Sequence, residues 1–222
     1  RGSGSANIKA ANRGIVAKGE LIVAEGIFDL RTEDDIFCGK ESVTLKGGAV
    51  RASTQGDKGK GVGSDGAVTL SGGSYVFAHT SEGIEGKTIE MRGGSFDISA
   101  DDDGMNAREH YDKEKTKTKK KEANPEVRIH IAGGELYVTA GGDGIDSNGD
   151  LIFSGGMSFV NGSDNGKDAA LDWNGSCRVD GGVLIASGMK ARAEKISPES
   201  AQPFFEWELG SEHPAREQIS VQ

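Results

Sequence analysis

Acidic and amide side chains recur at fixed offsets from an apolar residue in four glycine-containing segments, 81–87, 101–108, 141–150 and 167–175. The apolar residues are Ile84, Met105, Ile145 and Leu171. One position after them stand Glu85, Asn106, Asp146 and Asp172, and shortly before them stand Glu82, Asp102, Asp103, Asp143 and Asp168. Carboxylate and amide oxygens suit calcium, which accepts an irregular shell of about six to eight oxygen ligands. These nine residues are therefore candidate calcium ligands.

A repeat of glycines shows which elements would position these segments. The glycines fall at Gly26, Gly48, Gly73, Gly94, Gly134, Gly156 and Gly182, with spacings of 22, 25, 21, 40, 22 and 26 residues. Around each glycine the apolar residues alternate with period two, which is typical of β-strands. Five positions before it stand Leu21, Val43, Val68, Ile89, Ile129, Leu151 and Cys177. The outlying spacing of 40 contains a lysine-rich stretch, so we interpret residues 109–125 as an insertion on one coil.

This period predicts an all-β fold, a right-handed parallel β-helix of about seven coils of ~22 residues. We assign residues 1–13 to a linker or N-terminal cap, 14–189 to the β-helix, and 190–222 to a C-terminal cap or tail. In the tail, Phe204, Phe205 and Trp207 are predicted to cover the last coil, because a solenoid must cover its open end; the alternative is that the sequence is cut short there. Cys38 and Cys177 would lie five coils, or roughly 24 Å, apart, too far for a disulfide.

Stacked coils sharpen the calcium prediction, since carboxylates about 4.8 Å apart repel one another unless a cation lies between them. Asp and Asn also favour tight turns with glycine, which explains any single segment, but four aligned segments favour several calcium ions. An EF-hand fits segment 141–150 poorly, because the closing glutamate and a flanking helical pattern are both missing from the sequence. The four histidines lack the paired spacing of a zinc site. His130 lies between inward Ile129 and Ile131, so we expect it on the surface.

Composition limits the function classes. The formal net charge is −9 even with the basic stretch in 109–125, which argues against nucleic acid as a partner. No apolar run approaches the roughly 18 residues of a membrane span, so we expect no membrane insertion. The sequence shows no signal peptide, but its opening, RGSGS, is typical of a linker, so an export signal removed earlier remains compatible with it.

The stretch from residue 81 to 189, with EGIEG, GGSFDISADDDGMNA, GGDGIDSNGD and ALDWNG, resembles calcium-binding, carbohydrate-binding parallel β-helix proteins of bacterial cell surfaces. Residues 14–78 resemble that family more loosely, and its fold is related to that of pectate lyases. The resemblance implies a right-handed β-helix with several calcium ions at the acidic corners. It also implies secretion or cell-surface display, as a monomer or as part of a larger surface protein, and binding of plant polysaccharides such as cellulose or acidic pectin.

The candidate carbohydrate-binding residues are Trp173, Lys87, Arg108 and Lys40. Trp173 follows Asp172 at a corner where the equivalent residues are small, so its ring could stack on a sugar; alternatively it closes over the insertion or the coil end. Lys40, Lys87 and Arg108 share one corner column and would suit uronate carboxylates, arginine through a bidentate contact.

Two other functions use the same residues. A calcium-dependent lyase would need a base beside the metal, for which Arg108 or Lys87 are the candidates. However, the acidic residues are too repetitive to single out one catalytic cluster. A structural or adhesive surface module is the third hypothesis. We predict non-catalytic binding of a polysaccharide, and adding polygalacturonate with calcium and looking for an unsaturated product would separate it from lyase activity.

Overall fold

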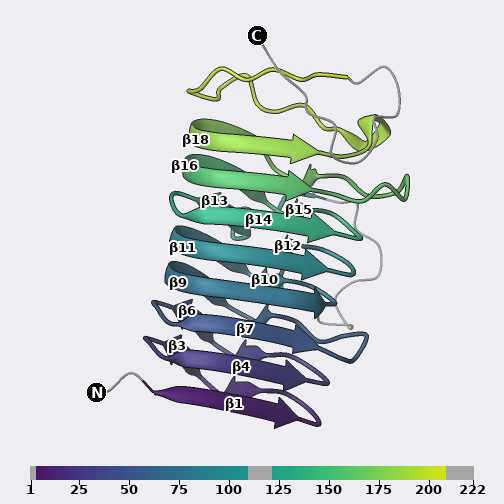
Figure 1. Cartoon of the computed structure of the whole chain (residues 1–222). Coiled ribbons are helices and arrows are strands. Elements are labelled where there is room, and N and C mark those ends of the chain that lie inside the picture. The colour runs from purple at the N-terminus through teal and green to yellow at the C-terminus, as the bar shows by residue number, and fades with distance from the viewer. Residues whose placement is uncertain (1–3, 110–121, 209–222) are drawn as a thin grey trace.

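The computed structural model describes residues 4–109 and 122–208. The fold is an all-β parallel solenoid whose coils stack along one axis, from the N-terminal end to the C-terminal end (Figure 1). It makes about eight turns with a repeat of about 22 residues, which confirms the predicted fold class. The extra turn comes from strand β1 (Ser5–Ala10), which pairs in parallel with β4 (Ile27–Thr32). β1 lies within residues 1–13, the segment assigned above to a linker or cap.

The larger sheet has 11 strands, and its order follows the stacking of the coils. Its strands are β1, β3 (Glu20–Val23), β4, β6 (Ser42–Leu45), β7 (Ala49–Thr54), β9 (Ala67–Thr80), β11 (Thr88–Ala100), β13 (Arg128–Ile131), β14 (Glu135–Ala140), β16 (Asp150–Asn161) and β18 (Cys177–Ser187).

The smaller sheet has seven short strands, each of which follows an acidic or charged corner. They are β2 (Ile15–Ala17), β5 (Phe37–Gly39), β8 (Val62–Gly63), β10 (Ile84–Gly86), β12 (Met105–Ala107), β15 (Ile145–Ser147) and β17 (Leu171–Trp173). The candidate metal and sugar residues lie on this sheet and on the corners directly before and after its strands.

The seven glycines that define the repeat all have positive φ, from 78° at Gly156 to 125° at Gly26. Glycine adopts this conformation without the steric cost that other residues meet. At Gly48 a Cβ atom would also lie 2.9 Å from the carbonyl oxygen of Gly26 on the preceding coil. Each coil therefore turns at a glycine because both the backbone conformation and the next coil exclude a side chain.

The core is a set of internal ladders in the predicted register. Val43 pairs with Val68, Val68 with Ile89, and Ile89 with Ile129, and all four are buried. Among the aromatic residues, Tyr75 and Phe96 stack with ring centroids 4.9 Å apart. The two cysteines are free, as predicted, and Cys177 is buried in the core.

The C-terminal tail covers part of the last coil, but not with the residues predicted to do so. Backbone N–H groups of Ser197 and Gln202 donate to carbonyl groups of Cys177 and Val179, and Ile196 packs against the core. Phe204, Phe205 and Trp207, by contrast, are 42%, 70% and 55% exposed. The prediction that these three rings supply the cover is wrong, because hydrogen bonds from the preceding residues already occupy the edge of β18.

The rest of the tail contains one short 3-10 helix, η1 (Lys190–Arg192). No helix in residues 4–109 and 122–208 is long and apolar enough to cross a membrane. Most of the predicted insertion, residues 110–121, lies outside the described part of the chain.

Candidate functional site

One column of corner residues runs along the whole solenoid. In each coil it lies two positions before the inward residue that starts a strand of the smaller sheet. The backbone fixes this register, since the amide after one column residue donates to the carbonyl of the next; Gly14, Gly61, Gly83 and Gly104 bond in this way to Asp35, Glu82, Asp103 and Asp143. From the N-terminal end the column contains Arg13, Asp35, Lys60, Glu82, Asp103, Asp143 and Ala169.

A second column lies three positions further along each coil. Paired residues of the smaller sheet place Val16, Cys38, Gly63, Glu85, Asn106, Asp146 and Asp172 in one line. The predicted alignment of Glu85, Asn106, Asp146 and Asp172 is therefore confirmed. Asp168 is not aligned with Glu82, Asp103 and Asp143 as predicted, because Ala169 takes that place and the loop before it is longer.

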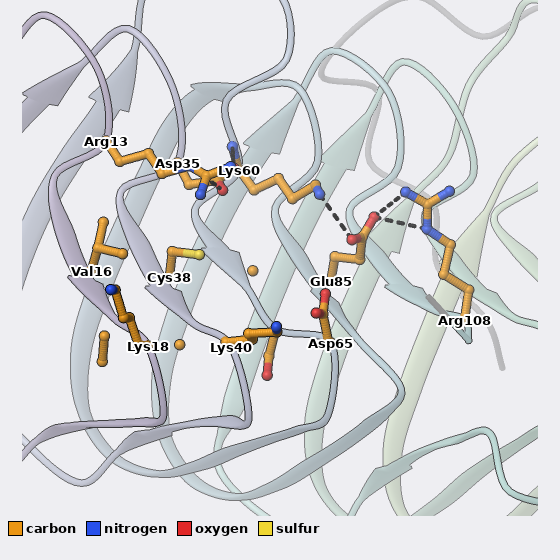
Figure 2. Close-up of a pocket in the computed structure, with 14 residues that line it drawn as sticks. Arg13, Val16, Lys18, Asp35, Cys38, Lys40, Lys60, Asp65, Glu85 and Arg108 are labelled. Atoms are coloured by element: carbon orange, nitrogen blue, oxygen red, sulfur yellow. Dashed lines mark hydrogen bonds and ion pairs between the residues drawn. The ribbon is translucent and has the colours of Figure 1, made fainter. Parts of the chain in front are cut away.

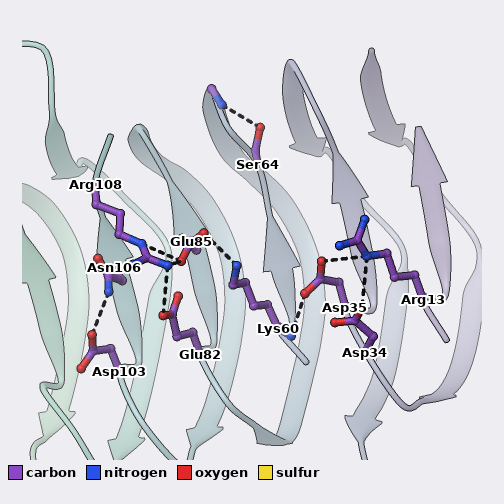
Figure 3. Close-up of polar contacts among 11 residues, drawn as sticks. Arg13, Asp34, Asp35, Lys60, Ser64, Glu82, Glu85, Asp103, Asn106 and Arg108 are labelled. Carbon is purple, nitrogen blue, oxygen red and sulfur yellow. Dashed lines mark hydrogen bonds and ion pairs between the residues drawn. The ribbon is translucent and has the colours of Figure 1, made fainter. Parts of the chain in front are cut away.

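In the N-terminal coils, positive and negative side chains alternate and pair with each other (Figure 3). Arg13 Nε lies 3.2 Å from Asp34 Oδ2 and 3.4 Å from Asp35 Oδ2. Lys60 Nζ lies 2.8 Å from Glu85 Oε1 on the next coil. The first coils thus neutralise their buried carboxylates with cations of the chain itself.

Glu85 receives cations from both neighbouring coils. Lys60 approaches it from one side. Arg108 approaches from the other side and donates two hydrogen bonds to Glu85 Oε2, one from Nε at 2.8 Å and one from Nη2. Arg108 Nη2 also lies 3.7 Å from Glu82 Oε1. We call the set Lys60, Glu82, Glu85 and Arg108 the charge ladder.

The two glutamates of the charge ladder differ in protonation. Burial, and then the neighbouring Glu85, raises the pKa of Glu82. For Glu85 burial acts in the same direction, but the hydrogen bond from Glu82 and the contacts with Lys60 and Arg108 outweigh it and lower the pKa. Glu85 is therefore the ionised member of the pair, and Glu82 is the member that holds a proton more readily.

The next coil has a different environment. Asp103 accepts hydrogen bonds from Asn106 Nδ2 at 2.8 Å and from the backbone N–H of Asp143, also at 2.8 Å. Burial, together with the charges of Asp102, Asp143 and Asp168, raises the pKa of Asp103 to about 7. Within the described residues, no lysine or arginine forms an ion pair with Asp103. We call Asp102, Asp103, Asn106, Asp143 and Asp168 the acidic corner.

The two regions differ in how well they suit a metal ion. Across residues 4–109 and 122–208, no three His, Cys, Asp or Glu side chains are grouped so as to hold one. Glu82 and Glu85 do not fit calcium, because lysine and arginine already occupy the positions that a cation would take. Glu82 Oε2 and Asn106 Oδ1 are both buried without a hydrogen-bond partner among the described residues. The acidic corner fits calcium better, because Arg108 Nη2 lies 3.7 Å from the other oxygen of Glu82, whereas no described lysine or arginine forms an ion pair with Asp103.

A groove of about 450 Å³ runs along the smaller sheet beside the charge ladder (Figure 2). Its lining comes from five successive coils, from Arg13 to Arg108. Lys18 and Lys40, at equivalent positions of adjacent coils, are exposed, and neither forms an ion pair with a described residue. By contrast, Lys60 and Arg108 in the same groove are engaged by glutamates.

The four predicted sugar-binding residues have different environments. Lys40 and Arg108 line the groove. Lys87 lies outside it and forms an ion pair with Glu126. Trp173 is only 8% exposed and packs in the core beside Ser147 of the preceding coil, so its ring offers no open face for a sugar. The position of Trp173 agrees with the alternative interpretation, in which its ring closes over the end of a coil.

The two predicted lyase bases are also engaged. Although burial opposes it, Glu85 and Glu82 raise the pKa of Arg108. The hydrogen bond to Glu126 raises the pKa of Lys87. A group with a raised pKa releases its proton less readily, so neither residue suits the role of a general base.

Four residues of the site, Arg13, Lys18, Asp35 and Lys60, were not predicted from the sequence. The predicted columns begin only at residue 81, where the residues are all acidic or amide. Extending the same offset to the first three coils would have revealed the alternation of Arg13, Asp35 and Lys60 with Glu82.

A comparison with protein families supports the resemblance noted from the sequence. The family model described as "Carbohydrate-binding domain-containing protein" matches residues 1–187. No curated protein and no solved structure matches the chain.

Proposed function

The chain belongs to the carbohydrate-binding domain family, and we propose that it binds an acidic, pectin-like polysaccharide in the groove of the smaller sheet. The observation that carries the proposal is the pair of exposed lysines, Lys18 and Lys40, on adjacent coils of an elongated groove. The proposal is non-catalytic binding at the cell surface or outside the cell.

The shape and charges of the groove support a polymeric, anionic ligand. A groove lined by five coils is long in one direction, which suits a chain that crosses several coils. Its carboxylates Asp35 and Glu85 are already paired with cations of the protein. A third carboxylate, Asp65, is exposed and also lines the groove, so the two ammonium groups are the cationic charges that remain to pair with uronate carboxylates.

Affinity electrophoresis in gels with polygalacturonate tests this site, and pull-down on insoluble cellulose tests the neutral alternative. We expect Lys18→Gln with Lys40→Gln to weaken retardation by polygalacturonate about tenfold, because two exposed charge contacts are worth up to ~1 kcal/mol each. Lys46→Gln is the matched control, since Lys46 is exposed but lies outside the groove. Equal retardation of both variants would count against the groove, and binding to cellulose alone would count against an acidic ligand.

We also propose that calcium binds at the acidic corner and not at the charge ladder. Asp103, with neighbouring Asp102, Asp143 and Asp168 and the buried oxygen of Asn106, would supply oxygen ligands. The role of such an ion would be to hold adjacent coils together by compensating their carboxylates. Nothing in the groove requires the ion, so the two proposals can fail independently.

Thermal unfolding with calcium and with a chelator tests the metal proposal. We expect calcium to stabilise the protein by about 2.7 kcal/mol at a hundredfold excess over its dissociation constant. Asp103→Asn should remove most of this response, whereas Glu85→Gln should keep it. A chelator that leaves the melting temperature of the wild type unchanged would argue against calcium at this corner.

A further inference from the structure

Three side chains on the outer face of the larger sheet form a linear array of acid, imidazole and hydroxyl. They come from successive coils: Glu90 from β11, His130 from β13 and Ser154 from β16. His130 Nε2 lies 2.7 Å from Ser154 Oγ, and His130 Nδ1 lies 3.4 Å from Glu90 Oε1. This array lies on a different sheet from the groove and takes no part in the function proposed above.

The order of the three groups is that of an activated serine nucleophile. In the tautomer that carries its proton on Nδ1, His130 directs this N–H toward Glu90 and accepts the hydroxyl proton of Ser154 at Nε2. A base within hydrogen-bond reach of a hydroxyl, itself oriented by a third group, is the arrangement that makes serine nucleophilic. We propose that Ser154, His130 and Glu90 form a catalytic site for hydrolysis of carboxylic esters.

Burial, a hydrogen bond and strand pairing all restrict the positions of His130 and Glu90. His130 and Glu90 side chains are 28% and 22% exposed, so their surroundings restrict both groups. Arg92 Nε donates to the same oxygen of Glu90 at 3.2 Å, which holds the carboxylate in place. His130 and Glu90 are also paired residues of adjacent strands, so the backbone fixes their spacing.

The backbone after Ser154 suits the second requirement, a donor for the developing oxyanion. Ser154 is followed by Gly155 and Gly156, and Gly156 turns the chain with φ of 78°. Neither glycine is paired with a residue of the neighbouring strands β13, β14 and β18. A sharp turn directly after a nucleophile can direct the following N–H groups toward the carbonyl oxygen of a substrate.

The surroundings of Ser154 indicate the class of substrate. The serine is exposed, and its paired residue on the next coil is Gly181, so no side chain at that position covers the hydroxyl. An open sheet face suits a small acyl group that is carried on a large molecule. An O-acyl ester of a polysaccharide meets this description.

The reaction balances with water as the second substrate. Ser154 Oγ bonds to the acyl carbon while its proton passes to His130 Nε2, and the electron pair of the carbonyl moves to the oxygen. When the tetrahedral intermediate collapses, the ester C–O bond breaks and the alcohol leaves with the proton from Nε2. Water then attacks the acyl-serine by the same route, which releases the carboxylic acid and regenerates Ser154.

Labelling with a fluorophosphonate, read by peptide mass spectrometry, tests the nucleophile in the full chain, and 4-nitrophenyl acetate tests turnover. We expect the label on Ser154, and we expect Ser154→Ala and His130→Gln to lose at least about 100-fold in rate. Glu90→Gln tests the positioning role and should lower kcat while leaving KM unchanged.

The chain contains its own matched control. Ser71 is also exposed and precedes a Gly72–Gly73 corner with φ of 93° at Gly73, but its hydroxyl donates to the carbonyl of Leu45 and contacts no imidazole in the described structure. Ser71→Ala should therefore keep the full rate, and Ser71 should stay unlabelled. An unlabelled Ser154, or equal rates for Ser154→Ala and Ser71→Ala, would overturn the proposal.

Discussion

The charge ladder and the acidic corner occupy equivalent positions on neighbouring coils, yet Glu85 of the ladder and Asp103 of the corner shift their pKa in opposite directions. In the ladder, Glu85 is held between Lys60 and Arg108. At the acidic corner, Asp103 is surrounded by other carboxylates, and its pKa rises to about 7. One fold thus accepts two solutions: cations of the chain keep Glu85 ionised, whereas a raised pKa favours proton uptake at Asp103 and, within the ladder, at Glu82. The solenoid backbone therefore does not impose the same charge compensation at every corner.

The largest effect should come from removing an internal cation of the ladder. Lys60→Met leaves the buried carboxylate of Glu85 with one cation fewer, and we expect a loss of about 3 kcal/mol in the free energy of unfolding. Urea unfolding would measure it. Adding Glu85→Gln to the same variant should restore part of the loss, since the unpaired charge is then gone. A loss below about 1 kcal/mol would mean that water compensates Glu85, and the contrast with the acidic corner would weaken.

A smaller effect should appear in the pH dependence of stability, to which Asp103 contributes between pH 4 and 7 and Glu82, whose pKa rises to about 8, adds a loss in the same direction. The pKa of Asp103 is raised in the folded state, so the folded protein binds the proton more tightly than the unfolded chain does. In chelator-containing buffer, stability should therefore be highest near pH 4 and fall as the pH rises toward 7, the folded pKa. The full shift corresponds to about 4 kcal/mol, and partial exposure reduces the expectation to about 2 kcal/mol.

Asp103→Asn provides the comparison for this pH series. Asparagine cannot ionise, so the variant should show a flatter profile between pH 4 and 7 than the wild type. Parallel profiles for the two proteins would show that another group causes the dependence. Calcium should make the stability of the wild type depend less on pH, because it binds and stabilises the ionised form of Asp103, which has no compensating cation when a chelator is present.

The smallest effect concerns the exposed lysines of the groove. Lys18→Gln and Lys40→Gln should change the free energy of unfolding by less than about 0.5 kcal/mol, because neither side chain is engaged in an ion pair in the described structure. Urea unfolding measures this change, and the Lys60→Met variant serves as the comparison because Lys60 lines the same groove. If the Lys40 variant were as unstable as the Lys60 variant, the distinction between ligand-facing and structural cations would not hold.

The sequence predicted the framework better than the chemistry. Seven glycines and one inward column define the coils, because steric exclusion and burial act at every repeat. The environment of Trp173 was not predictable in this way, since it depends on the single coil that covers the ring. Lys60 was missed because its role depends on a partner 25 residues away, and only the coil register brings it to Glu85. Asp168 was misaligned because a longer loop precedes its strand.

The direction of the hydrogen bonds along the solenoid also has a mechanical consequence. Each coil holds the next through bonds parallel to the long axis, such as that from Gly83 to Asp103 and that from Gly104 to Asp143. A force that pulls the two ends apart loads these interfaces in series, so the weakest interface opens first and the others follow one by one. A cation bound at the acidic corner, whose carboxylates come from adjacent coils, would strengthen that interface against such a force.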